Sequence, residues 1–243
     1  MTSRRIFVAG VTGAIGRRLA PILVEAGHDV IGSTRKPGHA DRLRELGVRP
    51  VIVDAYDADA LITAVVAARP EVVINQLTDL GGTRDGGLSD DRLARTARLR
   101  SIGTANLVRA AVAAGAGRLI AQSLALCYAT GREPHGEDDP LGLTEPWMSI
   151  TLPGVIELER LVRSEPSIEG IALRYGLLYG PGAATEEPDD PIAVHVDAAA
   201  WGAALAVDHG APGIYNIVDD GGPVSNAKAC AELDWRPDLR LPT

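Results

Sequence analysis

The chain has 243 residues, of which 46% are hydrophobic, and its formal net charge is -8; this length and composition suit one large domain with a sizeable buried core. The negative charge and the lack of a basic stripe in the sequence disfavour nucleic acid as a partner, and no apolar run is long enough to span a bilayer. Cys127 and Cys230 match no metal or redox spacing, so we expect a cytoplasmic protein without a metal site.

Short apolar runs alternate with amphipathic helical segments along the whole chain. The pattern predicts strands at 5–9, 29–33, 50–53, 71–77, 118–124, 168–174 and 213–218, and helices at 14–26, 40–46, 58–67, 90–114 and 150–162. Continuous runs rich in Val and Ile are typical of parallel strands that are covered on both faces. We therefore predict an α/β protein with a Rossmann doubly wound, mostly parallel sheet of seven strands.

Residues 1–243 are expected to form a single dinucleotide-binding Rossmann domain. Two loop-rich stretches interrupt the alternation, at 130–149 and 181–195, and both follow late strands. Ligands of open α/β sheets bind outside the carboxyl ends of the strands. We expect these loops and the C-terminal segment 213–243 to form a small, reduced substrate-binding lobe.

A glycine-rich turn connects the first predicted strand to the first predicted helix. Gly10, Gly13 and Gly16 are spaced three residues apart, and Thr12, Ala14 and Ile15 complete the turn. Such glycines permit a tight turn and close backbone approach to a pyrophosphate, while the helix N-terminus offers free N–H groups to the anion. We predict a nucleotide site here; the alternative is a turn with a structural role only.

The end of the second predicted strand indicates which nucleotide binds. The segment Ser33-Thr34-Arg35-Lys36 has hydroxyls and cations but no acid, which suits a 2′-phosphate, with Arg35 as its best partner and Thr34 beside it. Asp29 starts the strand, so it lies at the wrong end of the sheet to bind a ribose. We therefore predict NADP(H) as the cofactor; the alternative reading of the segment is a solvated basic turn.

Several motifs occur together and in order: the glycine turn, Ile102-Gly103-Thr104-Ala105-Asn106-Leu107, and the segment from Arg174 to Gly182. In these motifs the chain resembles the extended short-chain dehydrogenases/reductases, the NAD-dependent epimerases and dehydratases. The resemblance implies that Asp54, with Ala55, contacts the adenine and that Gln76 and Leu77 line the cofactor. It also implies a homodimer through the helices near 90–114 and 150–162.

The sequence departs from the family pattern where the family carries its acid–base residues. Aligning Glu159 with the family's glutamate places Thr151 at the tyrosine position and Val155 at the lysine position, and Leu124 stands where the family has Ser or Thr. A valine cannot stabilise a phenolate, and threonine is far too weak an acid to replace a tuned tyrosine. The usual acid–base mechanism of the family is therefore not available.

Other polar residues near the strand ends become candidates for chemistry. Ser123 and Tyr128 flank the end of the fifth predicted strand, and Thr151 retains a weak hydrogen-bond donor; the alternative is that the first two only cap the strand. His135, Glu137, Asp138 and Asp139 are best read as a solvated acidic loop, and Glu159 as a packing or polar-face residue. Trp147 and Met148 would line an apolar pocket if their loop folds over the crevice.

These observations lead to three functional hypotheses, of which the third, a decayed fold that has also lost cofactor binding, is disfavoured by the intact glycines and Arg35. The first is an enzyme that binds NADP(H) and acts on a small, fairly apolar metabolite, in a role typical of bacterial specialised metabolism. It would either transfer hydride without a Tyr-Lys pair or catalyse a non-redox cyclisation, dehydration or isomerisation. The second is a non-catalytic NADP(H)-binding sensor or regulatory protein, which the replaced acid–base residues suggest.

Overall fold

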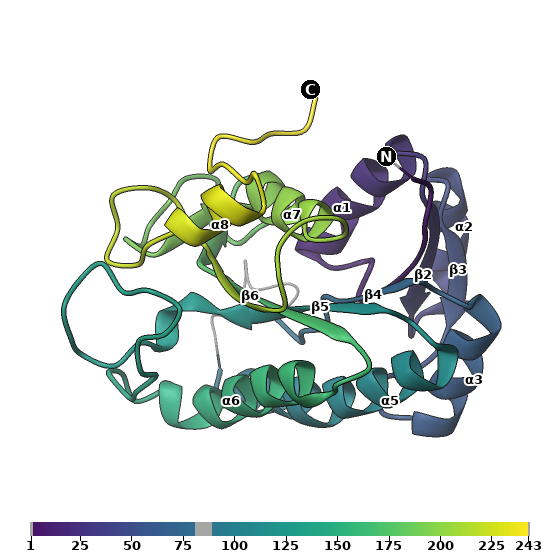
Figure 1. Ribbon diagram of the computed structural model, residues 1–243, viewed down its shortest axis with the longest axis horizontal. Helices are drawn as coiled ribbons and strands as arrows, with labels where there is room; N and C mark the ends of the chain where they lie inside the picture. The colour runs from purple at the N-terminus through teal and green to yellow at the C-terminus, as the bar shows by residue number, and fades with distance from the viewer. Residues whose placement is uncertain (1, 81–88, 243) are drawn as a thin grey trace.

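The structure, a computed structural model, describes residues 2–80 and 89–242 (Figure 1). Within them, seven parallel strands form a sheet in the order β3-β2-β1-β4-β5-β6-β9. The strands are β1 (Arg5–Ala9), β2 (Asp29–Thr34), β3 (Arg49–Ile52), β4 (Val72–Asn75), β5 (Arg118–Leu124), β6 (Glu169–Tyr175) and β9 (Gly213–Ile217). The predicted doubly wound sheet of seven strands is confirmed, with small differences at the strand ends.

Helices cover both faces of the sheet (Figure 1). On one face lie α1 (Ala14–Glu25) and α7 (Val196–Leu205), and on the other lie α3 (Ala58–Ala68), α5 (Thr104–Ala114) and α6 (Met148–Ser164). Shorter helices are α2 (Ala40–Glu45), α4 (Asp90–Arg98) and α8 (Ala227–Glu232). The strand order reverses between β1 and β4, and open α/β sheets bind ligands in the crevice outside the carboxyl ends of the strands at such a switch point.

The alternation of side chains along the strands divides the core into two halves. In β1, Ile6 and Val8 pack in the cluster under α1 and α7, whereas Phe7 and Ala9 pack in the cluster under α3 and α5. All four side chains are buried. Both faces of β1 are therefore apolar, which explains why its sequence reads as a continuous hydrophobic run.

The long helix expected over 90–114 has an interruption. One turn of π-helix, Leu99–Gly103, joins α4 to α5 and shifts the helix faces by one residue. Single 3-10 turns occur at Pro37–His39 and Ala125–Cys127, and a small parallel pair, β7 (Leu177–Tyr179) and β8 (Ala193–His195), follows β6. The sequence pattern predicted none of these four features.

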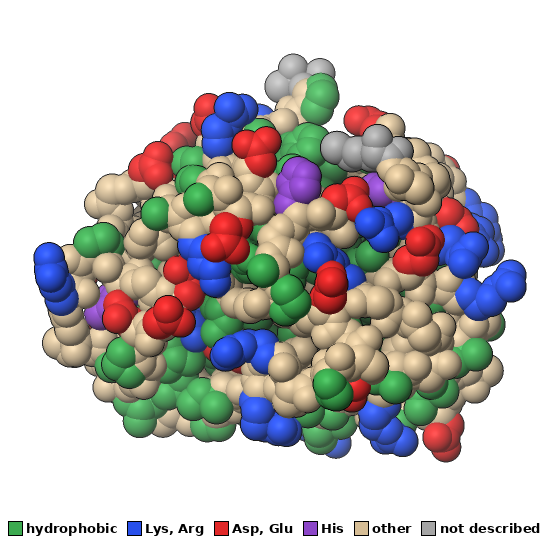
Figure 2. Space-filling model, viewed as in Figure 1, with side chains coloured by type: hydrophobic (Ala, Val, Ile, Leu, Met, Phe, Trp, Pro, Cys, Tyr) green, Lys and Arg blue, Asp and Glu red, His purple; other side chains and the backbone are tan. Residues whose placement is uncertain are grey.

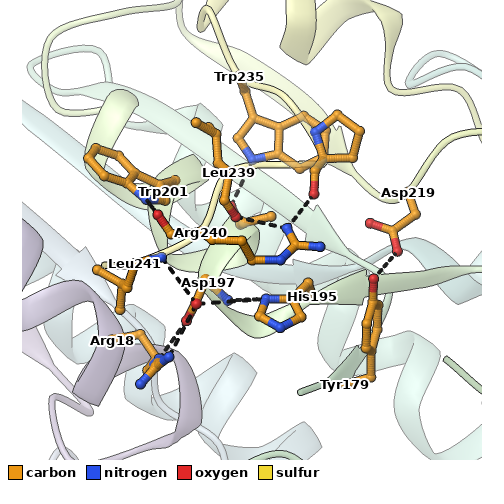
Figure 3. A network of polar contacts seen from close by, with 12 residues as sticks. Arg18, Tyr179, His195, Asp197, Trp201, Asp219, Trp235, Leu239, Arg240 and Leu241 are labelled. Carbon is orange, nitrogen blue, oxygen red and sulfur yellow. Dashed lines mark hydrogen bonds and ion pairs between the residues drawn. The ribbon is translucent and has the colours of Figure 1, made fainter. Parts of the chain in front are cut away.

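The chain after α8 packs back onto α7 instead of extending away from the domain (Figure 3). The Trp235 indole, which is fully buried, donates to the Ala198 carbonyl oxygen at 2.7 Å. The Trp201 indole donates to the carbonyl oxygen of Arg240, and the Leu241 amide donates to the Asp197 carboxylate. These contacts fix the C-terminal segment over the α1–α7 side of the sheet.

Candidate active site

The glycine turn between β1 and α1 has a geometry that only glycine permits. Gly10 has a φ of +84°, and a Cβ on it would lie 2.6 Å from the carbonyl oxygen of Gln76 at the end of β4. A Cβ on Gly16 would lie 2.4 Å from the Gly10 carbonyl oxygen. Gly10 and Gly16 therefore allow β1, β4 and α1 to approach closely at the switch point.

The first turn of α1 is open to an anion. Gly13 is the N-cap residue, no side chain caps the helix, and its first turn contains no acidic residue. Gly13 is exposed, while Thr12 and Ala14 are half-buried and Ile15 packs into the core. The free N–H groups and the helix dipole at this end favour a phosphate group.

The carboxyl end of β2 carries the residues expected to select the nucleotide. Thr34 is buried, and its hydroxyl accepts a hydrogen bond from the Lys36 amide at 3.2 Å. Arg35 is exposed and forms no ion pair with any residue in 2–80 or 89–242. Asp29 pairs with Arg49 at the opposite end of the strand, which agrees with its exclusion as a ribose ligand.

The next two strand ends supply the remaining residues that the resemblance implied. Asp54 follows β3, and its carboxylate accepts a hydrogen bond from the Tyr56 amide. Ala55 is buried, and its carbonyl oxygen accepts from the Asn106 side chain at 2.9 Å. Gln76 and Leu77 follow β4; Gln76 is buried, and its Oε1 atom has no hydrogen-bond partner.

Glu159 is not the packing or polar-face residue that we expected. Its carboxylate is buried and forms a two-point ion pair with Arg174 of β6, at 2.8 Å for each contact. Burial opposes the charge of Arg174, but the Glu159 carboxylate holds the pKa of this guanidinium above its ordinary value. This buried pair joins α6 to β6.

Two of the three candidate catalytic hydroxyls belong to the same network. Ser123 Oγ is buried and donates to Glu159 at 2.6 Å. Tyr128 Oη donates to the Asn216 side chain at 2.7 Å and accepts from Arg174 at 2.8 Å. Burial, the largest influence, raises the pKa of Tyr128 above its usual value, so this phenol is a poor acid at neutral pH.

The loop after β5 is anchored and not freely solvated as we expected. His135 is buried and stacks on Tyr128 with ring centroids 5.1 Å apart. Glu137 accepts a hydrogen bond from the Asn216 amide through its carboxylate, and from Arg174 through its carbonyl oxygen. Asp139 pairs with His135. The loop is therefore held against β6 and β9 by side chains that the sequence alone suggested were exposed.

Three segments expected to form the substrate lobe meet around one half-open pocket of about 210 Å³. Its lining includes Tyr128, His135, Thr144, Ile192 and Val224. Trp147 does not line it, and Met148 is buried, where its sulfur accepts a hydrogen bond from Thr144. The pocket is smaller than a drug-sized ligand site.

The positions that correspond to the family's tyrosine and lysine lie on one face of α6. Thr151 is buried, and its hydroxyl has no hydrogen-bond partner. Val155, one turn later, is fully buried beside Cys127 and Leu152. Neither residue supplies an acid of useful strength or a cation. Among the described residues, no group of His, Cys, Asp and Glu has the arrangement of a metal site.

Residues 6–207 match the family model for the NAD dependent epimerase/dehydratase family. The chain belongs to this family. A 3-diazoavenalumate denitrifying reductase from a Streptomyces species is 41% identical over 238 residues, which cover 89% of this family member and 76% of the relative. A 2-alkyl-3-oxoalkanoate reductase from Stenotrophomonas maltophilia is 29% identical over 73% of this chain and 52% of its own.

Solved structures of UDP-glucose 4-epimerases share the fold. The UDP-glucose 4-epimerase of Thermus thermophilus, solved with NAD, superposes with a TM-score of 0.76 at 20% identity, covering 98% of this chain and 95% of the epimerase. The relatives are reductases and epimerases, and this family member is an enzyme of the same oxidoreductase or epimerase type. In the ranges that the structure covers, no helix is long and apolar enough to cross a membrane.

Sequence reasoning missed one charged residue near the crevice. Arg100 lies in the π-turn with 3% of its surface exposed, and its Nε atom has no hydrogen-bond partner. A signal was present, because Thr96 and Thr104 flank it at four-residue spacing, which places all three on one helix face. The threonines indicate that this helix face packs against the sheet. An arginine on such a face is rare, because arginine side chains are seldom fully buried.

Proposed function

We propose that the chain is an NADP(H)-dependent reductase that removes the diazo group from an aromatic acid. One observation supports this proposal most: the chain keeps a glycine turn whose geometry suits a dinucleotide, but it has Thr151 and Val155 where the family has its acid–base residues. The cofactor, when bound, supplies a hydride. The substrate must then be one whose reduction needs no proton donor from the protein.

The residues around the switch point fit a nicotinamide dinucleotide. The open first turn of α1 would hold the pyrophosphate, and Asp54 and Ala55 would lie beside the adenine. Arg35, with Thr34 next to it, would bind the 2′-phosphate, because an exposed guanidinium without an ion-pair partner among the described residues is available for a bidentate contact. Gln76 and Leu77 would line the nicotinamide side, where the orphan Gln76 Oε1 offers an acceptor to the carboxamide.

The chemistry of a diazonium group suits a site without a tyrosine donor. Hydride addition to a carbonyl leaves an alkoxide, which a general acid normally protonates with a gain of about 10²- to 10⁴-fold in rate. Hydride addition to the terminal nitrogen of Ar–N₂⁺ instead neutralises a positive charge and gives Ar–N=N–H. Loss of N₂ then leaves Ar–H, so the sum is Ar–N₂⁺ + H⁻ → Ar–H + N₂. No proton is taken from the protein.

The name of the Streptomyces relative supports the substrate class, since it describes reductive denitrification of a diazo carboxylate, and the identity of 41% extends over most of this chain. We propose that the loops 130–149 and 181–195 and the segment 213–243 receive this substrate. Ser123 and Tyr128 already have buried hydrogen-bond partners, so we assign them to positioning α6, β6 and β9 rather than to proton transfer.

The test is turnover of a carboxylated arenediazonium salt with NADPH under anaerobic conditions, with mass detection of the arene and N₂ and absorbance detection of NADPH. We expect one arene and one N₂ for each NADPH oxidised. NADPH binding without any reduction would contradict the proposal and favour a sensor. Failure to bind either NADPH or NADH would remove the dinucleotide site altogether.

A further inference from the structure

Arg100 is buried, and its charge has no ion-pair partner within residues 2–80 and 89–242. Thr104, on the same helix face, accepts a hydrogen bond from the Asn75 side chain, and Thr96 accepts one from the Asp79 amide. This face therefore lies against the carboxyl end of β4. Ligands of open α/β sheets bind outside the carboxyl ends of the strands, so Arg100 lies on a helix face next to the ligand-binding end of the sheet.

The ionisable groups that influence Arg100 most do not neutralise it. Cys127 and Glu159 are the ionisable groups with the largest influence on its pKa. Burial raises the pKa of the Cys127 thiol to about 11, so the thiol is neutral at pH 7, and the Glu159 carboxylate already binds Arg174 through both oxygens. Burial lowers the pKa of Arg100 to about 10, which still leaves it charged at neutral pH.

A second buried polar group without a hydrogen-bond partner lies on α6, the helix that packs against the π-turn. Cys127 packs against Val155 and Leu152 of α6, and Thr151 lies one turn before Val155 on the same face. Thr151 is 1% exposed, and its hydroxyl has no hydrogen-bond partner among the described residues. The Arg100 guanidinium and the Thr151 hydroxyl are thus both related to Cys127 and Val155, and the Arg100 Nε and Thr151 Oγ1 atoms each have no hydrogen-bond partner among the described residues.

An unpaired buried charge destabilises a folded protein, because desolvation is not offset by an ion pair or by hydrogen bonds. Such a group is retained where a ligand completes it, and sites of this kind are held at a cost in stability. A carboxylate is the ligand that best neutralises a guanidinium and accepts its N–H groups, because the two planar groups form two parallel hydrogen bonds. A neutral ribose or ketone would leave the charge uncompensated.

We propose that Arg100, with the Thr151 hydroxyl beside it, forms the subsite for the carboxylate of the substrate. This inference rests on the proposed function, because it identifies the ligand as the substrate. The substrate is then not a wholly apolar metabolite but an aromatic ring that carries an anionic group. Arg100 is then the specificity-determining residue of the crevice, and Val155 supplies the apolar wall next to it.

Binding of an aromatic acid and its neutral ester to the NADP⁺-loaded protein tests the subsite without any turnover. The probes are 4-hydroxycinnamate and its methyl ester, measured by calorimetry. We expect the wild type to bind the acid roughly tenfold or more tightly than the ester, and Arg100→Met to lose this preference by weakening the acid only. Arg100→Lys should retain part of it. Arg98→Met, which removes an exposed arginine two residues earlier, should behave as the wild type.

A second readout separates a ligand-binding arginine from a structural one. Removing an unpaired buried charge should raise the melting temperature of the ligand-free Arg100→Met variant by about 2 to 4 °C. A fall in melting temperature, an unchanged acid preference in Arg100→Met, or no acid binding by the wild type would each overturn the assignment. Acid binding that depends on Arg100 in a protein that reduces no diazonium would refute the proposed reaction and leave the subsite standing.

Discussion

At the scale of single residues, three hydroxyls that the sequence placed near the crevice have different surroundings. The Ser123 and Tyr128 hydroxyls are held in the Glu159–Arg174 network, while the Thr151 hydroxyl has no partner. Hydrogen-bonding partners, which no single sequence position encodes, decide which group is available to a ligand. The network residues should therefore govern stability, and Arg100 and Thr151 should govern substrate binding.

Glu159→Gln tests the stabilising role of the network. Because it leaves the Arg174 guanidinium buried without its carboxylate, we expect the free energy of unfolding to fall by about 3 to 5 kcal/mol, as measured by urea denaturation. Glu157→Gln is the control, since Glu157 pairs with Arg160 at the surface of the same helix, and it should change stability little. Equal losses of stability in the two variants would show that the buried Glu159–Arg174 pair stabilises the fold no more than a surface ion pair does.

Arg35→Ser tests cofactor selection at the end of β2. Loss of the guanidinium removes a charge-assisted contact to the 2′-phosphate, so we expect NADPH to bind roughly tenfold or more weakly. NADH binding should not change, because NADH lacks that phosphate. Arg42→Ser, in an exposed position of α2, is the matched control. Parallel losses for NADPH and NADH in fluorescence titrations would contradict the assignment of Arg35.

At the scale of elements, α1 and α7 are joined by a charged contact whose strength depends on pH (Figure 3). Asp197 in the first turn of α7 forms a two-point ion pair with Arg18 of α1. Burial acts to raise the pKa of Asp197, but hydrogen bonds from Arg18 and the Leu241 amide hold it below the usual 3.8. The same carboxylate therefore links α1, α7 and the C-terminal segment.

Asp197→Asn should reveal this linkage in acid. A carboxyl whose pKa is lowered by folding stabilises the folded state at pH values above its unfolded pKa, and this contribution is lost as pH falls through the folded pKa. The wild type should thus be more stable than Asp197→Asn at neutral pH by about 1 to 3 kcal/mol, and the difference should shrink below pH 3.8. A difference that stays constant in acid denaturation curves would refute the ion pair as its source.

The outer surface of the α4–α6 region offers a place for a second copy of the chain, and we propose that it forms the homodimer implied by the family resemblance. Ile156 of α6, Ile102 of the π-turn and Val112 of α5 are 50%, 42% and 41% exposed. Figure 2 shows hydrophobic side chains gathered at the lower left edge of this view, over α6. Exposed apolar side chains that gather on one face are typical of protein interfaces.

Ile156→Arg tests the dimer proposal. A charge in the middle of an apolar interface has no partner there and should convert a dimer into monomers at micromolar concentration, as measured by light scattering. Val66→Arg is the comparison variant, because Val66 is also exposed, at 40%, but belongs to α3 and not to the helices α4–α6 of the proposed interface. A wild type that is monomeric at all concentrations would remove the proposal.

At the scale of the whole molecule, the sheet and its crevice were predictable because both depend on local patterns. Buried parallel strands are continuous apolar runs, and the glycine turn has a fixed spacing between strand and helix. The buried Glu159–Arg174 pair was not predictable, because it joins a helix to a strand through a contact that hydrophobic periodicity does not encode. The π-turn that carries Arg100 was missed for a similar reason, since one extra residue in a helical turn leaves the apolar pattern almost unchanged.

The proposed reduction of a diazonium needs no proton donor from the protein. A comparison of two substrates with one aromatic acid skeleton, a diazonium and an aldehyde, tests this by their initial rates with NADPH and the same enzyme. We predict a kcat/KM for the diazonium at least about 10²-fold above that for the aldehyde, because only the aldehyde needs a general acid. Comparable rates for both, or faster reduction of the aldehyde, would show that the site contains a proton donor and would contradict the account.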